Sequence, residues 1–381
     1  MKLAIFIYSL SGGGAERVVS YLLLYFVKNN IQVSLICMNT MVSYEIPDGL
    51  EIYYIEKSKH DENGLFKAFK IPILAYRYSR LMKKLRITHS ISFLTRPNFV
   101  NILSSKLTQH KYKVITNERA FPSLQYGYKG FQSKFNKKMI TLLYNKSDLI
   151  IANSYGNAED LVNNFGVSPE KMKIVHNPIH LEKINEIDPI KSYFDKNKFN
   201  MITVGRLTTG KNFALIINAI YKLKNPLLKL YIIGDGSLYG QLENLINNLK
   251  LNDQIVLMGF DSNPYKYLKS ADLFVFGSNH EGFPNVLLEA MSCGIPVLST
   301  NCKSGPSEIM ELKELKNDIM ITNYGILTPT NNVDLMAKGI NYFVQNDEYL
   351  MRCRDNVKKR IQDFKKEKVL KEYMEIINPN T

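Results

Sequence analysis

Short apolar runs and amphipathic segments alternate along the first half of the chain. Runs such as residues 3–8 are continuously apolar, which is typical of strands buried on both faces of a parallel sheet. The next segment places Val18, Leu22 and Phe26 on one helical face. Repetition of this unit predicts a mostly parallel, doubly wound α/β sheet. We expect a helix at 155–165 and strands at residues 3–8, 31–37, 50–55, 89–94, 112–116, 148–152 and 172–175.

A second strand–helix series begins near residue 200, and the stretch before it has a different character. Residues 178–199 contain two prolines and mixed charge without a strong period, so we interpret them as an interdomain region. The second series predicts strands at 200–204, 229–233, 254–258, 272–276 and 296–299.

The length of the chain, 381 residues, is too great for one hydrophobic core and favours two domains. A final basic helix, expected at 358–377, is long enough to cross back to the first domain. We therefore expect an N-terminal Rossmann-like domain at 1–180, a linker at 181–199, a C-terminal Rossmann-like domain at 200–365 and a C-terminal helix at 366–381.

Composition narrows the class of protein. Hydrophobic residues make up 45% of the chain, as in ordinary soluble globular proteins. The four cysteines form no C-x-x-C pair, which argues against a zinc site and a disulfide framework and fits a reducing cytosol. No apolar run reaches the ~18 residues that a membrane span needs. The N-terminal sequence MKLAIFIYSL is interpreted as a first strand and not as a signal peptide.

Positive charge is concentrated in the first half. The net charge is +14, of which residues 1–190 carry +10 (25 basic against 15 acidic residues). Between Glu62 and Asp148 the only acidic residue is Glu118, against 17 basic ones. Such a region suits nucleic acid, an anionic membrane surface or a phosphorylated lipid. Residues 65–86 interleave lysines and arginines with aromatics, and Pro72 is expected to begin a new helix there. This pattern fits a membrane-surface helix, with a merely solvated helix as the alternative.

Three consecutive glycines follow the first predicted strand. Gly12, Gly13 and Gly14 permit a tight turn and a close backbone approach, as at the opening of a doubly wound nucleotide fold. The spacing is not G-x-G-x-x-G, and no Lys-Ser/Thr pair follows, so neither dinucleotide nor ATP binding is indicated. The alternative is a tight turn without a ligand.

The stretch GSNHEGFPNVLLEAMSCGIPV, residues 277–297, combines a loop and a helix after a predicted strand. Pro284 fits the first helical position, and the helix is expected to end near Gly294. A helix N-terminus suits an anionic phosphate, and ionised carboxylates suit sugar hydroxyls. The carboxylates here are Glu281 and Glu289, for which a solvated loop residue and a helix-cap charge are the alternatives.

A second loop carries two cations at the end of the second domain's first strand. Arg206 and Lys211 are five residues apart there, so they could clamp a diphosphate, with a loop salt bridge as the alternative. After the next strand, Gly234-Asp235-Gly236 is a weak signal, and Asp235 is expected to cap the following helix. The sequence has no D-x-D and no His/Cys cluster, so we expect neither a metal nor another cofactor.

These motifs, taken together, resemble the retaining glycosyltransferases of glycosyltransferase family four, which have the GT-B fold of two Rossmann-like domains facing a central cleft. The matching elements run in order along nearly the whole chain: GGGAER, NS at 153–154, GRLTTGKN, GDGSL, GF at 259–260 and EGFPNVLLEA. The stretches AIFIYSLSGGGAERVV, SYEIP, GNAEDLVNNFGVSPEK and GFDSNPYKY are similar to a narrower group. That group comprises bacterial N-acetylgalactosaminyltransferases that extend an undecaprenyl-diphosphate-linked oligosaccharide for protein N-glycosylation, and O-antigen and capsule enzymes are similar.

The resemblance implies a role for each matching residue. Arg206 and Lys211 would stabilise the departing nucleotide diphosphate, and Glu281 would contact the donor sugar. Arg119 stands where many relatives carry a histidine; an arginine cannot act as a base, so it would orient the sugar or a phosphate. The remaining implied donor contacts are Glu289 at the ribose hydroxyls, Gly13 and Gly14 at the diphosphate across the cleft, and the backbone of Gly282, Phe283, Asn285 and Val286.

The resemblance also implies the partners. It predicts a UDP-sugar donor bound by the C-terminal domain, and a polyprenyl-diphosphate-linked oligosaccharide acceptor and the membrane facing the N-terminal domain. It also predicts transfer with retention and without metal, and a cytoplasmic protein on the inner face of the cell membrane. An O-antigen or capsule transferase with another hexose donor remains an alternative, as does a GT-B epimerase or phosphorylase. A nicotinamide dehydrogenase lacks its glycine spacing here, and no nucleic-acid-binding module is recognised, so nucleic acid is not an expected partner.

Overall fold

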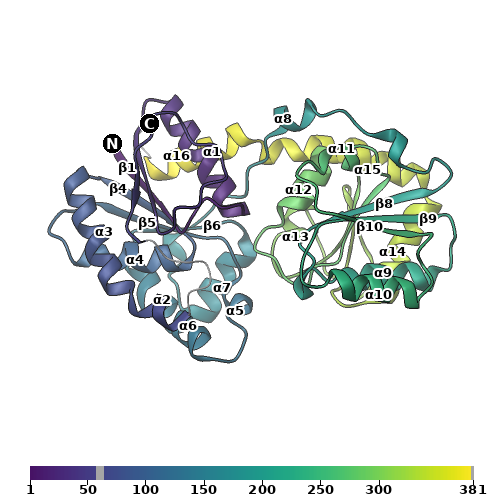
Figure 1. Ribbon diagram of the computed structural model, residues 1–381, viewed down its shortest axis with the longest axis horizontal. Coiled ribbons are helices and arrows are strands. Elements are labelled where there is room, and N and C mark those ends of the chain that lie inside the picture. Colours follow the sequence, from purple (N-terminus) through teal and green to yellow (C-terminus); the bar gives the residue numbers. More distant parts are fainter. Residues whose placement is uncertain (57–63, 379–381) are drawn as a thin grey trace. The chain divides into compact units, whose positions relative to one another are not determined.

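The computed structural model describes residues 1–56 and 64–378 (Figure 1). The chain forms two compact units, and each is described by itself. The first unit contains residues 1–178 and the C-terminal segment from Glu367 onward, and the second contains residues 179–366.

The first unit is built on a seven-stranded parallel sheet with the order β3-β2-β1-β4-β5-β6-β7. Its first six strands follow the doubly wound order 3-2-1-4-5-6. All seven strands expected in this half are present, each within two residues of the expected bounds. They are β1 Lys2–Ile7, β2 Gln32–Cys37, β3 Ile52–Tyr54, β4 His89–Phe93, β5 Lys113–Glu118, β6 Leu149–Ala152 and β7 Met172–Ile174.

Helices cover both faces of this sheet because side chains alternate along each strand. Ala4 and Phe6 of β1 pack with α3, α4, α6 and α7. Leu3, Ile5 and Ile7 point to the other face, where α1 and α16 supply the cover. The helices are α1 Gly14–Lys28, α2 Gly64–Phe69, α3 Ile71–Leu85, α4 Thr95–Lys106, α5 Pro122–Gln125, α6 Phe131–Leu143, α7 Tyr155–Phe165 and α16 Lys366–Ile377, with 3-10 turns η1 Tyr144–Lys146 and η2 Pro169–Lys171.

The second unit repeats the architecture with the strand order β10-β9-β8-β11-β12-β14-β13. Six strands are parallel in the order 3-2-1-4-5-6, and the edge strand β13 is antiparallel to β14. The expectation of two Rossmann-like parallel-sheet domains is therefore confirmed. The strands are β8 Phe199–Val204, β9 Leu228–Ile233, β10 Ile255–Gly259, β11 Leu273–Phe276, β12 Val297–Thr300, β13 Met320–Ile321 and β14 Gly325–Thr328.

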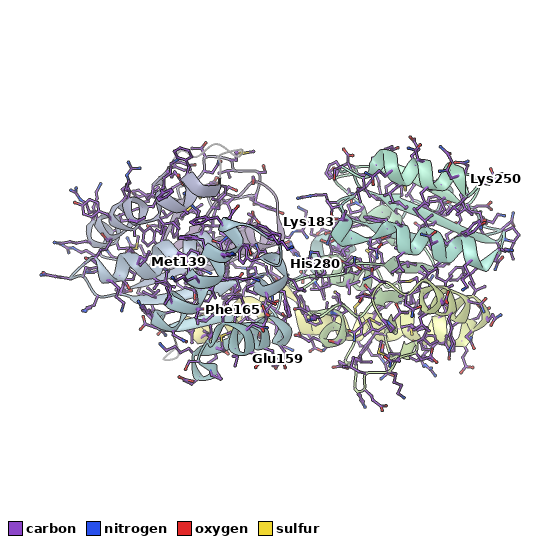
Figure 2. All side chains as sticks on the ribbon, turned by 90° about the horizontal axis from the view of Figure 1, so that it is seen from below. Met139, Glu159, Phe165, Lys183, Lys250 and His280 are labelled. Carbon is purple, nitrogen blue, oxygen red and sulfur yellow. The ribbon has the colours of Figure 1, made fainter. Side chains whose placement is uncertain are left out.

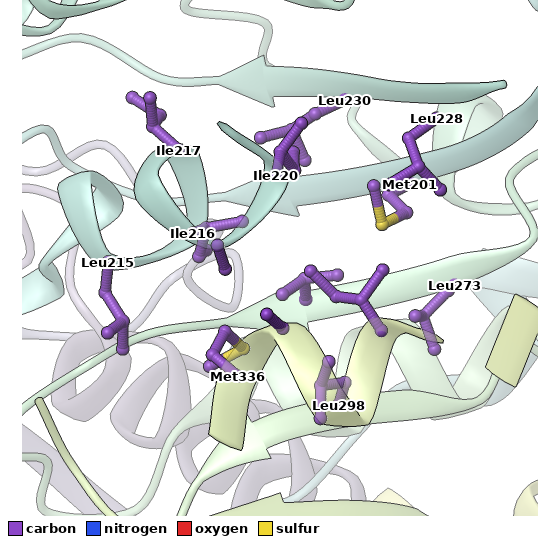
Figure 3. Close-up of a cluster of buried hydrophobic side chains, with 14 of the residues drawn as sticks. Met201, Leu215, Ile216, Ile217, Ile220, Leu228, Leu230, Leu273, Leu298 and Met336 are labelled. Atoms are coloured by element: carbon purple, nitrogen blue, oxygen red, sulfur yellow. The ribbon is translucent and has the colours of Figure 1, made fainter. Parts of the chain in front are cut away.

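Two hydrophobic clusters flank the second sheet. Figure 3 shows one of them, in which Met201, Leu273 and Leu298 from the strands pack with α9 and α14. On the other face, α12 and the end of α15 pack against Ile202 and Phe274. The helices are α8 Leu181–Asn185, α9 Phe213–Leu223, α10 Tyr239–Asn248, α11 Tyr265–Leu268, α12 Asn285–Ser292, α13 Pro306–Ile309, α14 Val333–Gln345 and α15 Asp347–Arg360, with 3-10 turns η3 Lys191–Tyr193, η4 Thr209–Lys211 and η5 Ile361–Phe364.

Two sequence expectations need correction. Residues 181–199, expected as a linker, lie in the second unit, because Leu181, Ile184 and Phe194 are buried in its core. The expectation of a single helix at 358–377 was wrong, because α15 ends at Arg360 and α16 begins at Lys366. Between them Lys365 is extended (φ −56°, ψ 135°). Within the described residues, no helix is both long and apolar enough to cross a membrane.

Candidate active site

Most of the predicted donor-site residues lie at one edge of the second sheet, where its parallel strands end. Strands β8 and β11 are neighbours there. The sheet continues from β8 to β9 on one side and from β11 to β12 on the other. The strand order therefore reverses between β8 and β11, and in open α/β sheets ligands bind at such a switch point. The loop 205–212 follows β8, and the loop 277–284 follows β11.

The loop after β8 presents Arg206 to solvent. No hydrogen-bond or ion-pair partner is found for its guanidinium within the described parts of the chain. The flanking backbone is fixed, because Leu207 N–H donates to the Asp235 carbonyl at 2.9 Å and Leu238 N–H donates to the Leu207 carbonyl at 3.1 Å. The structure thus holds the peptide rigidly and leaves the cationic side chain accessible to an anion.

The Gly234-Asp235-Gly236 turn makes this arrangement possible. A Cβ on Gly234 would lie 1.9 Å from the Gly205 carbonyl oxygen. Gly234 and Gly236 both have positive φ angles, 149° and 159°. The turn therefore supports the neighbouring loop by close backbone packing. Asp235 does not cap the next helix as expected, because its Oδ1 accepts from Gly236 N–H at 2.7 Å and α10 begins after Leu238.

Lys211 and Glu281 come together from the two loops. The Lys211 Nζ lies 2.6 Å from Glu281 Oε1, and the Ser278 hydroxyl donates to the same oxygen at 2.7 Å. The lysine nitrogen also lies 5.5 Å from the centre of the Phe276 ring. The two side chains are 28% and 14% exposed, so the pair is half-shielded from water. The sequence placed both residues near the donor but gave no signal that they would pair with each other.

Further contacts, absent from the sequence prediction, interlock the two loops. Asn279 N–H donates to the Gly210 carbonyl at 2.9 Å, and the Ser278 hydroxyl oxygen lies 3.0 Å from the same carbonyl oxygen. Asn212 Nδ2 donates to Asn279 Oδ1 at 3.1 Å. The His280 ring, labelled in Figure 2, covers the position that a Cβ on Gly210 would occupy. A polar cluster on adjacent strand ends is the signal that could have indicated these residues.

Helix α12 begins at the same edge and carries Glu289. Pro284 is its N-cap with an extended conformation (φ −75°, ψ 100°), so the helix starts one residue later than expected, at Asn285. The Glu289 carboxylate lies in the second turn and is only 8% exposed. Phe283 is buried, whereas Gly282, Asn285 and Val286 are partly exposed. The helix N-terminus thus stands beside the loop that holds Glu281.

The glycine turn of the first unit lies at the end of β1. Gly13 is the N-cap of α1, which begins at Gly14, and the Tyr44 hydroxyl donates to the Gly13 carbonyl at 3.0 Å. A Cβ on Gly13 would lie 2.4 Å from Glu16 Oε2. Burial raises the pKa of the Glu16 carboxyl above its ordinary value. The glycines therefore form the tight turn that the sequence predicts.

Arg119 follows β5 and is held inside the first unit. One guanidinium nitrogen donates to the Tyr373 hydroxyl at 2.8 Å, and the other donates to Asn177 Oδ1. The Tyr373 hydroxyl in turn donates to Asn117 Oδ1 at 3.0 Å. Arg119 is 9% exposed, and its side chain ties α16 to the end of β5. The sequence offered no signal for this link, because Tyr373 lies 254 residues away.

Within residues 1–56 and 64–378, no cluster of three or more His, Cys, Asp or Glu side chains is suited to a metal ion.

Comparison with known proteins gives consistent matches along the chain. Residues 12–183 match the family described as Glycosyltransferase Family 4, and residues 185–360 match the family described as Glycosyl transferases group 1. The N-acetylgalactosamine-N,N'-diacetylbacillosaminyl-diphospho-undecaprenol 4-alpha-N-acetylgalactosaminyltransferase of Campylobacter jejuni is 40% identical, covering 99% of each chain. An uncharacterized glycosyltransferase of Methanocaldococcus jannaschii is 31% identical, covering 86% of this chain and 87% of its own.

Solved structures share the fold of the whole chain. The crystal structure of Anabaena HepE in complex with UDP superposes with a TM-score of 0.80 at 18% identity, covering 100% of both chains. The apo lipopolysaccharide outer core galactosyltransferase WaaB gives a TM-score of 0.77 at 21% identity, again covering 100% of both chains.

Proposed function

The chain belongs to glycosyltransferase family four and has the GT-B fold, and from this premise we propose that it moves an N-acetylhexosamine from a UDP-sugar onto a polyprenyl-diphosphate-linked glycan. N-acetylgalactosamine is the best candidate for the sugar, since the Campylobacter jejuni relative is named for that transfer. The UDP in the HepE complex supports the choice of nucleotide. The product would be an intermediate of bacterial surface-glycan or N-glycan assembly.

The observation that carries this proposal is the convergence of opposite charges at the switch point of the second sheet. Arg206 offers an accessible guanidinium, and Lys211 offers an ammonium held at 2.6 Å by Glu281. A diphosphate bound at this edge would meet both cations and the N-terminus of α12, which also favours anions. Charge that develops on the departing UDP would be stabilised electrostatically, the main task in this kind of reaction.

The carboxylates would hold the neutral parts of the donor. When Lys211 turns to a phosphate, Glu281 can accept hydrogen bonds from sugar hydroxyls. Glu289, in the second turn of α12, would accept from the ribose hydroxyls. These assignments account for two carboxylates in a site that binds an anion.

The proposed transfer needs no general base at Arg119. Arg119 cannot take a proton from the acceptor hydroxyl, because its guanidinium stays protonated in proteins. We propose that the acceptor hydroxyl attacks from the face that the diphosphate leaves, with the leaving phosphate receiving the proton, so that the anomeric configuration is retained. No metal is invoked in this scheme. Arg119 would act on the donor only indirectly, through the position of β5 and α16.

A membrane-bound acceptor gives the basic first unit a use. Helix α3 exposes Ile73 and Tyr76 together with Arg80, Lys83 and Lys84. Apolar and cationic side chains on one helix face suit the interface of an anionic membrane. We propose that this face docks the protein peripherally on the cytoplasmic leaflet, where the lipid-linked glycan is presented.

The proposal can be tested with purified protein, a bacterial lipid extract and a panel of UDP-sugars supplied one at a time. Mass spectrometry of the lipids should show the addition of one N-acetylhexosamine with UDP-N-acetylgalactosamine. Addition of a hexose instead would indicate an O-antigen or capsule type of donor. Conversion of the UDP-sugar without any lipid product would overturn the proposal in favour of an epimerase or phosphorylase.

Substitution of Arg206 tests the donor site itself. Arg206→Ala should lower turnover by about 100-fold, the loss typical of removing a preorganised charge-stabilising donor. Arg352→Ala, which removes another exposed arginine of the second unit, serves as the matched control and should leave turnover unchanged. Near-normal turnover of the Arg206 variant would discard the assignment.

A further inference from the structure

The segment at the end of β12 supports the loop that carries Glu281. The Thr300 hydroxyl donates to the Ser278 carbonyl at 2.5 Å, and the Ser304 hydroxyl donates to the Gly282 carbonyl, also at 2.5 Å. Thr300 is fully buried, and Ser304 is 1% exposed. Two buried hydroxyls therefore hold the candidate donor loop on both sides of Glu281.

The supporting segment, residues 300–305, is itself fixed to the second sheet. Its Asn301 N–H donates to the Thr328 carbonyl at the end of β14, at 2.7 Å. Gly305 ends the segment with a positive φ angle of 95°, and a Cβ there would overlap Pro284 Cδ. The backbone of the segment thus packs directly against the start of α12. The donor loop is held by a part of the chain that is anchored to the sheet.

The Thr300 hydrogen bond also affects the turn that carries Lys211. A trans peptide group is planar, and its C=O and N–H point in opposite directions. Because Thr300 holds the Ser278 carbonyl, the Asn279 N–H of the same peptide group points away from Thr300. This N–H donates to the Gly210 carbonyl at 2.9 Å, directly before Lys211. Hydrogen bonds linked in this way strengthen one another, so the buried hydroxyl helps to fix the turn.

Ser304 orients a second peptide group in the same way. It holds the Gly282 carbonyl, so the Phe283 N–H is directed away from Ser304. The backbone of Phe283 is among the donor contacts that the family resemblance implies. Both supports are neutral hydroxyls, so neither competes with a phosphate for Lys211 or changes the charge of Glu281.

We propose that Thr300 and Ser304 are positioning residues of the donor site, and this inference rests on the proposed function. Thr300 sets the turn from which Lys211 reaches the diphosphate, and Ser304 aims the Phe283 N–H at the same group. Removal of either hydroxyl frees one carbonyl and the peptide group that it orients. Groups that stabilise developing charge work only in a fixed geometry, and a misplacement of ~1 Å can cost about 100-fold in rate.

Calorimetric titration of the full-length protein with UDP tests both residues without turnover. Thr300→Val and Ser304→Ala each remove one hydroxyl, and each should weaken UDP binding by at least about tenfold, the loss expected for a misplaced hydrogen bond to a charged group. Thr300→Ser keeps the hydroxyl and should bind UDP nearly as the unmodified protein does. Steady-state kinetics of the two hydroxyl-free variants should show a higher donor KM and a lower kcat, with an unchanged acceptor KM. Equal UDP affinity of Thr300→Ser and Thr300→Val would contradict a role for the hydroxyl.

Ser133→Ala separates positioning from stability. Ser133 of the first unit is 3% exposed, and its hydroxyl donates to the Tyr126 carbonyl at 2.5 Å, so this hydrogen bond matches that of Ser304. Both serine-to-alanine variants should lower the midpoint of urea denaturation, but only Ser304→Ala should lose UDP affinity. Equal UDP affinity of the two folded variants would show a merely structural role and overturn the proposal for Ser304. Should Ser304→Ala fail to fold, the comparison of Thr300→Val with Thr300→Ser decides the question.

A double-mutant cycle tests the route through Lys211. In a Lys211→Ala background, Thr300→Val should weaken UDP binding little further, because the group that Thr300 positions is gone. Ser304→Ala should still cause about a tenfold loss in that background, because it acts through the Phe283 N–H. A full effect of Thr300→Val in the Lys211→Ala background would overturn the assigned route.

The unmodified protein distinguishes this inference from the proposed function. If the unmodified protein binds no UDP, the proposed function fails and the inference fails with it. If it binds UDP and transfers sugar while both hydroxyl-free variants bind UDP equally well, only the inference fails.

Discussion

At the scale of single residues, the ion pair between Lys211 and Glu281 joins the two loops of the proposed donor site. The 2.6 Å contact neutralises both side chains while no anion is bound. In the proposed site, a diphosphate would therefore compete with Glu281 for the ammonium, and the displaced carboxylate would become an acceptor for the sugar. This exchange would couple donor binding to the orientation of Glu281.

Glu281→Gln tests that exchange. The variant removes the competitor for Lys211, so UDP should bind as tightly as before or more tightly. Turnover should fall by about 100-fold, because the amide holds the donor sugar less well than a carboxylate in the transition state. Calorimetry with UDP and steady-state kinetics measure the two effects.

The control for Glu281→Gln is another lysine–carboxylate pair of the second unit. Lys266 and Asp261 lie 2.9 Å apart, and Asp261→Asn should change neither UDP affinity nor turnover. If UDP affinity and turnover both fell in Glu281→Gln, the carboxylate would be needed to place Lys211, and the exchange would be wrong.

Glu118 gives a stability prediction. Burial raises the pKa of its carboxyl above the ordinary value, although Tyr144 and the Arg119 N–H donate to it at 2.6 and 3.0 Å. The folded state then binds the proton more tightly than the unfolded state. Its contribution to the free energy of unfolding is fully present below the ordinary value near 4.5 and is lost as pH rises through the raised value.

Urea denaturation of the unmodified protein and Glu118→Gln, at several pH values between about 4.5 and 8, measures this contribution. The difference in the free energy of unfolding, unmodified protein minus variant, should decrease as pH rises. A difference that stays constant or increases with pH would show that the hydrogen bonds outweigh burial.

Sequence reasoning named the charged residues but not their partners. Arg206, Lys211, Glu281 and Glu289 stand out because they occupy a strand-to-helix loop or a helix start. The pairing of Lys211 with Glu281 depends on which strands are adjacent, and the sequence leaves strand order open. The buried hydrogen bond from Arg119 to Tyr373 is even harder to predict from the sequence, because it depends on the return of α16 to the first unit.

At the scale of elements, close packing between the turns after β8 and β9 positions Arg206. Gly234→Ala would place a methyl group against the Gly205 carbonyl, in a backbone conformation that alanine rarely adopts. We expect a loss of roughly 2–4 kcal/mol in the free energy of unfolding, from strain and overpacking together. The donor KM should rise as well, because relief of the clash displaces the loop that carries Arg206.

Gly240 provides the internal control, six positions along the same chain segment. It lies in the first turn of α10, and a Cβ there meets no atom within 4 Å. Gly240→Ala should stabilise the protein by about 0.5–1 kcal/mol, since alanine favours the helix. Urea denaturation gives both values, and equal stability of the two variants would contradict the assigned role of Gly234.

The elements themselves were largely predictable because buried parallel strands read as continuous apolar runs. Strand β13 spans only Met320–Ile321, which is too short to form a recognisable apolar run. Strand β14, Gly325–Thr328, was also not predicted, although it is as long as β11 and β12. The break between α15 and α16 was missed for a tertiary reason. Ile179 N–H donates to the Phe364 carbonyl at 2.8 Å, and Lys366 N–H donates to the Ile179 carbonyl at 2.9 Å. The backbone pairing with the distant residue Ile179 interrupts the helix that the local sequence pattern predicts through this segment.

At the scale of the whole molecule, the same bridge joins the two passages of the chain between the units. The chain enters the second unit at Ile179 and leaves it after Lys366. The first and last residues of this unit are therefore the pair that the hydrogen bond from Lys366 N–H to the Ile179 carbonyl joins. The sequence suggested a single linker of 19 residues, 181–199, whereas these residues contribute to the core of the second unit. The connection is thus a pair of adjacent backbone segments.

The net positive charge of the molecule is concentrated in its first half, and this makes the proposed membrane docking testable. Residues 1–190 hold 25 of the 49 basic residues but only 15 of the 35 acidic ones. Within this half, α3 exposes Arg80, Lys83 and Lys84 beside the apolar Ile73 and Tyr76. Each cation near an anionic surface contributes roughly 1 kcal/mol, and the apolar pair adds burial in the interface.

The triple variant Arg80→Glu/Lys83→Glu/Lys84→Glu should therefore bind anionic vesicles at least about 100-fold more weakly, from three lost attractions of ~1 kcal/mol each. Flotation with phosphatidylglycerol-containing and purely zwitterionic vesicles measures this loss of binding. Raised salt should also weaken the binding of the unmodified protein to anionic vesicles, because salt screens the attraction.

The matched control changes three exposed lysines of the second unit, Lys224, Lys250 (labelled in Figure 2) and Lys359, to glutamate. Both triple variants have the same net charge, so an equal loss of binding would show that total charge and not the α3 face is responsible. Equal recovery of the unmodified protein with both vesicle types would contradict docking through this face altogether.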